Sequence, residues 1–139
     1  MKYIGPDFCN ITSLLTDEEL LIQKTANEFV AKEFLPVVNE YYKKGSFPKK
    51  LIAKMGKLGF FGATLPKKYG GSEISSTGYG LIMQELEKGD SGLRSVCSVQ
   101  GGLVMYPIFE YGSKEQKEKW LPKLAAGEAV GCFGLTESN

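Results

Sequence analysis

Hydrophobic residues recur at helical spacing along most of the chain. Thr16-Asp17-Glu18-Glu19 has the form of an N-terminal capping box, in which a hydroxyl and a carboxylate each bond the other residue's backbone N–H. Apolar residues then follow at i, i+4, i+7, i+8 and i+12, and these are Ile22, Ala26, Phe29, Val30 and Phe34. The pattern predicts an amphipathic helix that packs this stripe against a core.

Proline and glycine divide the next stretch into further predicted helices. Pro36 either ends the first helix or opens a second one over 37–44, which Gly45 stops. Pro48 fits the first position of a third helix, and Gly59 ends it. The residues of the third helix expected to face the core are Leu51, Ile52, Met55 and Leu58. A loop is predicted over 65–72, where one proline and two adjacent glycines occur.

The second half of the chain predicts three more helices. One runs from about Ser75 to Lys88, and a long apolar helix follows the turn at 89–92 and continues to about Tyr111, with Pro107 as a kink or a split. Ser113-Lys114-Glu115-Gln116 is a second capping box, and Gly127 ends the helix that it opens. The inward residues of these helices are expected to be Tyr79, Ile82, Met83, Leu86, Trp120, Leu121 and Leu124.

The final stretch differs from everything before it. Residues 129–136 (AVGCFGLT) are apolar and lack helical spacing, so a strand is predicted there. A single strand needs partner strands, and the rest of the sequence predicts none. We therefore expect an all-α chain: a helical bundle domain over 1–128, followed at 129–139 by the start of a β-domain that this chain does not complete.

Composition narrows the classes of function. With 42% hydrophobic residues, the 139-residue chain can form a core without disulfides or metal. The formal net charge of +1 favours neither nucleic acid nor a membrane as partner. The longest uncharged run, 95–109, is shorter than the roughly 20 apolar residues of a membrane span.

The reactive residue types exclude several chemistries. Histidine is absent, which excludes Ser-His and Cys-His catalysis and His-ligated zinc. The three cysteines, Cys9, Cys97 and Cys132, are widely spaced, as is typical of reduced thiols in a reducing compartment. The first residues, MKYIGPDF, have neither a signal nor a transit pattern, so we expect the cytoplasm, or the mitochondrial matrix after removal of a transit peptide.

Arg94 is the strongest candidate for a binding residue. It is the only charged residue between Asp90 and Glu110, and a guanidinium stays protonated and is costly to bury unpaired. Ser98 lies one helical turn further on the same face, and Ser95 is adjacent. Two interpretations stay open, because the anion that Arg94 requires is supplied either by Asp90, four residues back, or by a ligand.

Other features carry less information about function. Gly101 and Gly102 each cost about 1 kcal/mol relative to alanine within a helix, and either close helix packing or a ligand explains them. The carboxylate pairs Glu18/Glu19 and Glu85/Glu87 lie on amphipathic helices and are expected to face solvent, so no catalytic carboxylate is predicted. The sequence has no GxGxxG or GxxxxGK[ST] phosphate loop and predicts no metal ligand.

Several ordered motifs resemble the acyl-CoA dehydrogenases. They are Ser91-Gly92-Leu93-Arg94-Ser95, Ser98-Val99-Gln100, the stretch YGSKEQK at 111–117, WLPKLA at 120–125, and GCFGLTE at 131–137. The resemblance covers about residues 14–139, and the DSGxRS, SVQ and GCFGLTE motifs are similar to the glutaryl-CoA dehydrogenase branch of the family.

This resemblance implies roles for two groups of residues. Arg94 and Ser95 would meet the distal carboxylate of a dicarboxylic acyl chain, with the Ser98 hydroxyl in the same pocket. Phe133, Leu135 and Thr136 would lie along FAD, with backbone groups and the Thr136 hydroxyl bonded to the edge of the flavin ring. Without the resemblance, Thr136 would be interpreted as an ordinary strand threonine.

The resemblance also implies an activity that needs more than this chain. The complete enzyme would oxidise an acyl-CoA with FAD, convert glutaryl-CoA to crotonyl-CoA with decarboxylation, transfer electrons to an electron-transfer flavoprotein, and form a homo-oligomer. The glutamate base and most of the FAD site belong to the family's later domains. We therefore expect no catalytic residue here, weak or no FAD binding, and no activity of the chain alone. A non-catalytic helical module and a subunit of a split enzyme are the alternatives.

Overall fold

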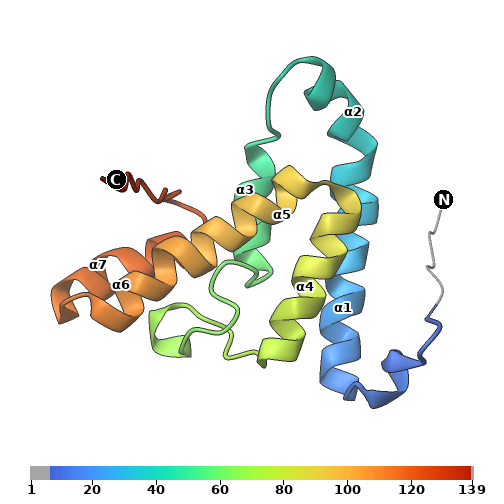
Figure 1. Cartoon of the computed structure of the whole chain (residues 1–139), viewed down its shortest axis with the longest axis horizontal. Coiled ribbons are helices and arrows are strands. Elements are labelled where there is room, and N and C mark those ends of the chain that lie inside the picture. The colour runs from blue at the N-terminus through green and yellow to red at the C-terminus, as the bar shows by residue number, and fades with distance from the viewer. Residues whose placement is uncertain (1–6, 139) are drawn as a thin grey trace.

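Helices form the architecture of the chain (Figure 1). The computed structural model describes residues 7–138, and Met1–Pro6 and Asn139 lie outside the described residues. The α-helices are α1 (Asp17–Phe29), α2 (Leu35–Lys43), α3 (Lys50–Lys57), α4 (Ser76–Gly89), α5 (Ser91–Ser98), α6 (Tyr106–Tyr111) and α7 (Lys114–Ala125). Two π-helical segments, η2 (Val30–Phe34) and η4 (Val99–Met105), and two short 3₁₀ segments, η1 (Ile11–Leu14) and η3 (Lys67–Tyr69), connect or precede them. The predicted all-α fold is confirmed, and no described helix is long and apolar enough to cross a membrane.

Both predicted capping boxes are formed. The Thr16 hydroxyl accepts from the Glu19 N–H at 3.2 Å, and the Glu19 carboxylate accepts from the Thr16 N–H at 3.0 Å. Ser113 and Gln116 make the same pair of bonds at the start of α7. These bonds satisfy backbone donors that have no partner within a helix, and so define where α1 and α7 begin.

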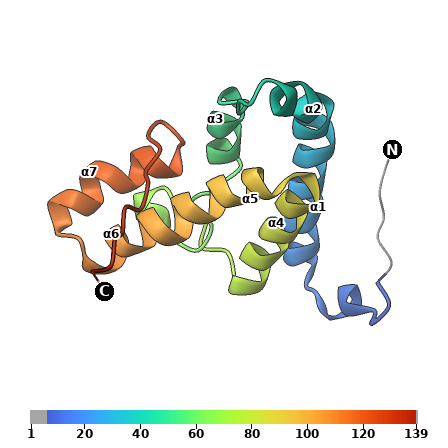
Figure 2. The same cartoon turned by 45° about the horizontal axis from the view of Figure 1, so that its top comes forward.

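A π-helical segment precedes both Pro36 and Pro107, and the helical path continues through each proline. Pro36 follows η2 and Pro107 follows η4, so α1–η2–α2 and α5–η4–α6 form two long rods (Figure 2). Proline lacks an N–H and its ring crowds the carbonyl four residues earlier, and a wider turn relieves that crowding. Pro36 therefore opens the next helix, and Pro107 lies within a continuous rod.

The core forms where α1 and η2 pack against α4, and Leu51 and Met55 of α3 belong to the same buried cluster. The predicted stripe is buried at Ala26, Phe29, Val30 and Phe34, and the Phe29 and Phe60 rings meet edge to face with centroids 5.7 Å apart. The prediction that Leu58 and Trp120 face the core is wrong, because each residue is 40% exposed. Leu58 lies beyond the last turn of α3, and the Lys119 ammonium lies over the Trp120 ring, 4.8 Å from its centroid.

Glu85 corrects the prediction that the acidic pairs face solvent. It is 1% exposed, and its carboxylate accepts from Gln23 Nε2 at 3.1 Å and Asn27 Nδ2 at 2.8 Å, both on α1. The Lys88 ammonium lies 2.6 Å away on α4 itself. A buried charge is tolerated only when it is paired and hydrogen-bonded, and these three partners provide both. Glu85 therefore ties α4 to α1.

The predicted strand over 129–136 is not formed. Residues 129–138 adopt neither helix nor strand, and Figure 1 shows them as a tail that leaves the end of α7. A strand requires a neighbouring strand for its backbone hydrogen bonds, and the described part of the chain offers none. The apolar side chains of the tail beyond Ala129 are exposed, with Phe133 at 53% and Leu135 at 65%.

Candidate functional site

Asp90 forms the junction between α4 and α5, and its carboxylate does not bind the Arg94 guanidinium. Its backbone is extended (φ −173°, ψ 138°), and its carboxylate accepts from the N–H groups of Gly92 at 2.7 Å and Leu93 at 3.2 Å. Asp90 is thus the N-cap of α5. The interpretation that pairs Arg94 with Asp90 is wrong, because capping directs this carboxylate to the backbone.

Arg94 instead bonds Glu87 and Ser98, and we call these three residues the Arg94 cluster. Arg94 Nε donates to Glu87 Oε2 at 2.8 Å, and Nη1 donates to Ser98 Oγ at 3.2 Å. Ser98 Oγ donates in turn to the carbonyl of Ser95 at 3.2 Å. The structure therefore brings Arg94 and Ser98 together as predicted, and it adds Glu87, whose role the sequence did not indicate.

The geometry leaves Arg94 able to bind a further anion. Its side chain is 35% exposed, and the two bonds use Nε and one N–H of Nη1 out of five guanidinium donors. Arginine presents these donors as a planar fork that matches a carboxylate. Glu87 compensates the charge from the Nε side, and the Nη2 side has no hydrogen-bond partner among residues 7–138.

The Arg94 guanidinium lowers the pKa of Glu87 by hydrogen bonding, and the Ser91 hydroxyl, which donates to Glu87 at 2.7 Å, adds to that shift. The carboxylate is therefore ionised at neutral pH. The Glu87 and Arg94 side chains are 48% and 35% exposed, so the pair contributes little to stability. The effect of the ion pair is to orient the Arg94 guanidinium, because Glu87 holds its Nε.

Replacing Arg94 with methionine should raise the pKa of Glu87 toward the ordinary value of about 4.3, because the largest cause of its lowering is removed. In the parent chain, the stability linked to this shift is present above the unfolded-state pKa and is lost as the pH falls through the lower folded-state pKa. The Arg94→Met variant should lose most of this pH dependence of stability, and the Ser91 hydroxyl bond should retain the rest. Carbon-detected NMR of the Glu87 carboxyl across pH 2–7 measures the shift. Ser91→Ala should raise the pKa less, and an unchanged pKa in Arg94→Met would contradict the pairing.

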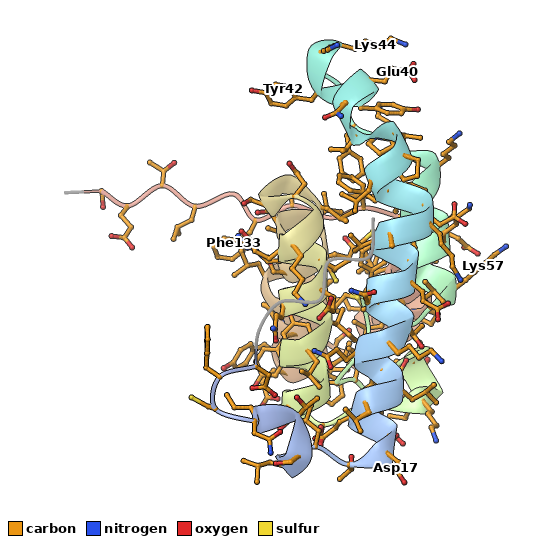
Figure 3. All side chains as sticks on the ribbon, turned by 90° about the vertical axis from the view of Figure 1, so that its right-hand side faces the viewer. Asp17, Glu40, Tyr42, Lys44, Lys57 and Phe133 are labelled. Atoms are coloured by element: carbon orange, nitrogen blue, oxygen red, sulfur yellow. The ribbon has the colours of Figure 1, made fainter. Side chains whose placement is uncertain are left out.

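The other predicted group, Phe133, Leu135 and Thr136, lies in the exposed tail. Figure 3 shows Phe133 where the tail leaves the helices, with the chain beyond it extending away from them. All three residues are exposed, so the helices of this chain do not enclose them. They are accessible to a ligand or to another part of a larger fold.

Gln100 is a second residue whose role the sequence did not indicate. It is 1% exposed, and its amide bonds three backbone groups, which belong to Leu124, Ala129 and Gly131. One feature of the sequence could have indicated this role: Gln100 is the only residue with an amide side chain within the uncharged run 95–109. Gln100 thus links η4 to the start of the tail.

The two mid-helix glycines have different explanations. A Cβ on Gly101 would lie 2.8 Å from the Phe61 carbonyl oxygen, so close backbone packing explains that glycine. A Cβ on Gly102 would meet nothing within 4 Å, and Gly102 is exposed on η4 beside Leu103, which is 47% exposed. Packing within the described residues therefore accounts for only one of the pair.

A groove of about 530 Å³ lies away from the Arg94 cluster. Its lining residues come from α1, η2 and α3 and its end, and include the apolar Leu21, Phe29 and Leu58. Four lysines line it as well, among them Lys57, which Figure 3 shows beside α1. No lining residue belongs to α4 or α5, so this volume does not mark the site predicted from the sequence. Among residues 7–138, no cluster of side chains is suited to hold a metal ion.

Comparison with known proteins identifies the family. Residues 16–128 match the model of the acyl-CoA dehydrogenase N-terminal domain. A crystal structure of a glutaryl-CoA dehydrogenase from Mycobacterium smegmatis in complex with FADH2 is similar at a TM-score of 0.90 and 44% identity, over 94% of this chain and 34% of that one. A structure described as the electron transferring flavoprotein of Acidaminococcus fermentans is similar at a TM-score of 0.83 and 41% identity, over 88% and 32%.

The human mitochondrial short-chain specific acyl-CoA dehydrogenase is 32% identical over 123 residues, which are 88% of this chain and 30% of that protein. The chain belongs to the acyl-CoA dehydrogenase family. It spans about a third of the length of the relatives it matches.

Proposed function

We propose that this chain forms the N-terminal part of an FAD-dependent acyl-CoA dehydrogenase that acts on glutaryl-CoA and yields crotonyl-CoA by oxidative decarboxylation. The observation that carries the substrate assignment is the Arg94 cluster, a partly exposed guanidinium with unused donors next to a serine hydroxyl. The 44% identity to a glutaryl-CoA dehydrogenase supports the same substrate.

The Arg94 cluster suits the distal carboxylate of a dicarboxylic acyl chain. A guanidinium and a carboxylate form charge-assisted hydrogen bonds, which are about twice as strong as neutral ones. Glu87 holds Nε, so an incoming carboxylate meets the Nη side, where the Ser98 hydroxyl and the neighbouring Ser95 lie. A butyryl chain offers no anion and would place a methyl group against this cation.

The tail suits an edge of the flavin. We propose that the β-domain begins at residue 129 and that Phe133, Leu135 and Thr136 contact FAD. The tail's exposed backbone groups and the Thr136 hydroxyl are available to hydrogen-bond a ring edge. FAD, when bound, supplies the oxidising chemistry; the role of this chain is to orient the substrate's distal end and to line one side of the cofactor.

The partners and compartment of the complete enzyme follow from the same assignment. An acyl-CoA, here glutaryl-CoA, is the proposed substrate, and an electron-transfer flavoprotein is the proposed electron acceptor. A solved structure described as an electron transferring flavoprotein contains a chain similar to this one. We further propose a homo-oligomer. The cytoplasm is the proposed compartment, or the mitochondrial matrix; the human relative is described as mitochondrial.

A chimera tests this proposal, in which the chain replaces the matching third of the Mycobacterium smegmatis enzyme. The chimera should retain FAD and oxidise glutaryl-CoA with an artificial electron acceptor, whereas the 139-residue chain alone should show no turnover. Turnover by the chain alone would overturn the assignment of the base and flavin site to other domains. A folded, FAD-loaded chimera that oxidises butyryl-CoA but not glutaryl-CoA would overturn the substrate.

A further inference from the structure

Gln100 is a buried amide whose hydrogen bonds all lead to one segment of the chain. Nε2 donates to the carbonyl oxygens of Leu124 at 2.9 Å and Ala129 at 2.8 Å, and Oε1 accepts from the Gly131 N–H at 2.9 Å. Both amide hydrogens and the amide oxygen are therefore used. A buried polar side chain with every partner aligned fixes one geometry, because any displacement leaves several groups unsatisfied.

The partners of Gln100 define the path by which the chain leaves the helices. Leu124 lies in the last turn of α7, Gly127 turns the chain with φ +72°, and Ala129 and Gly131 begin the tail. Figures 1 and 2 show the tail passing from the end of α7 to the rod formed by α5, η4 and α6. The hydrogen bonds of the Gln100 side chain hold the start of the tail against that rod.

Gly131 has a second contact at the same place. A Cβ on Gly131 would overlap both γ-carbons of Val104, which lies four residues after Gln100 on η4. The backbone of Gly131 therefore lies directly against η4, and its amide faces the Gln100 oxygen. Two independent features, a hydrogen bond and a close approach that requires glycine, hold the same residue.

We propose that Gln100 is a positioning residue that sets where the flavin-contacting segment begins relative to the Arg94 cluster. This inference rests on the proposed function, since it takes Phe133–Thr136 as the flavin contact. Phe133 is two residues after Gly131, and each residue extends the chain by at most about 3.6 Å. Because Gly131 is fixed, the Cα atom of Phe133 lies within about 7 Å of the Gly131 Cα atom. Arg94, Ser98 and Gln100 stand on one continuous rod, so that rod carries both the carboxylate contact and the anchor of the flavin segment.

Amide hydrogen exchange in the 139-residue chain tests the anchor. In Gln100→Leu, the Gly131 amide loses its acceptor and should exchange faster by about 10-fold or more relative to amides of α1 and α4. Gln100→Glu keeps an acceptor for Gly131 and should give an intermediate rate, and it replaces the leucine variant if that one does not fold. Met105→Leu, a buried change on the same π-helical segment, should leave Gly131 exchange relative to α1 and α4 unaltered. Gly131 exchange equal to the parent in both Gln100 variants would overturn the inference.

The flavin readout uses the chimera with the Mycobacterium smegmatis enzyme and separates this inference from the proposed function. Gln100→Leu should weaken FAD retention and shift the flavin absorption bands, and Met105→Leu should do neither. Thr136→Val tests the segment itself and should also shift those bands. If Thr136→Val shifts them and Gln100→Leu does not, the positioning role is overturned and the flavin contact stands. If neither shifts them, the flavin contact fails as well, whatever the exchange of Gly131.

Discussion

Replacing Arg94 with methionine is expected to lower the preference for glutaryl-CoA over butyryl-CoA by between about 30-fold and about 5,000-fold. The range corresponds to roughly 2–5 kcal/mol for a substrate carboxylate that loses its charged, hydrogen-bonded partner in a desolvated pocket. Methionine keeps much of the volume of arginine and removes its charge. The measured quantity is the ratio of kcat/KM for the two substrates in the chimera, which cancels general damage to the fold.

The Arg94 cluster itself supplies the controls. Arg94→Met leaves the Glu87 carboxylate without its cation, and that negative charge would itself repel the distal carboxylate of glutaryl-CoA. The double variant Arg94→Met/Glu87→Gln removes this repulsion and should keep most of the loss of preference. Lys54→Met removes an exposed ion pair with Glu33 that involves no residue of the Arg94 cluster, and it should leave the ratio unchanged. An equal loss for both substrates in Arg94→Met would show that Arg94 serves only to hold Glu87.

Replacing Gly56 with alanine is expected to destabilise the chain by about 1–3 kcal/mol, although helix propensity alone predicts a gain of about 1 kcal/mol. Gly56 lies within α3, and a Cβ there would overlap the carbonyl group of Ala126 at the end of α7. A backbone carbonyl cannot move aside as the end of a flexible side chain can, so α3 must separate from α7. Urea unfolding followed by circular dichroism measures the change.

Gly80 provides the matched control for Gly56. It also lies inside a helix, α4, but a Cβ there would meet nothing within 4 Å. Gly80→Ala should therefore stabilise the chain by about 0.5–1 kcal/mol through helix propensity. If Gly56→Ala stabilised the chain as much as Gly80→Ala does, the close contact between α3 and the end of α7 would be wrong.

The sequence by itself determined the helices and, for α1 and α7, where they begin, whereas α3 begins at Lys50 and not at the predicted Pro48. The capping boxes at Thr16 and Ser113 and the stripe from Ile22 to Phe34 are local features, because residues three and four apart adjoin within the same helix wherever that helix lies. The motif around Arg94 was recognised for the same reason, since its members lie close together along the chain. Arg94 and Ser98 meet one turn apart on α5, as predicted.

Only the tertiary structure decided the partners of the polar groups and the fate of the tail. The spacing of four residues suggested Asp90 for Arg94, but that rule holds within one helix, and Asp90 is the break between two. The sequence pattern predicted that Glu85 faces solvent. In the structure it is buried, because Gln23 and Asn27, about sixty residues away in the sequence, donate hydrogen bonds to its carboxylate. The cost of alanine at Gly56 depends on α7, which the local sequence does not contain. The stretch 129–136 has the composition of a strand and forms none here, because a strand is stabilised by hydrogen bonds to a neighbouring strand and helix bonds lie within the helix itself.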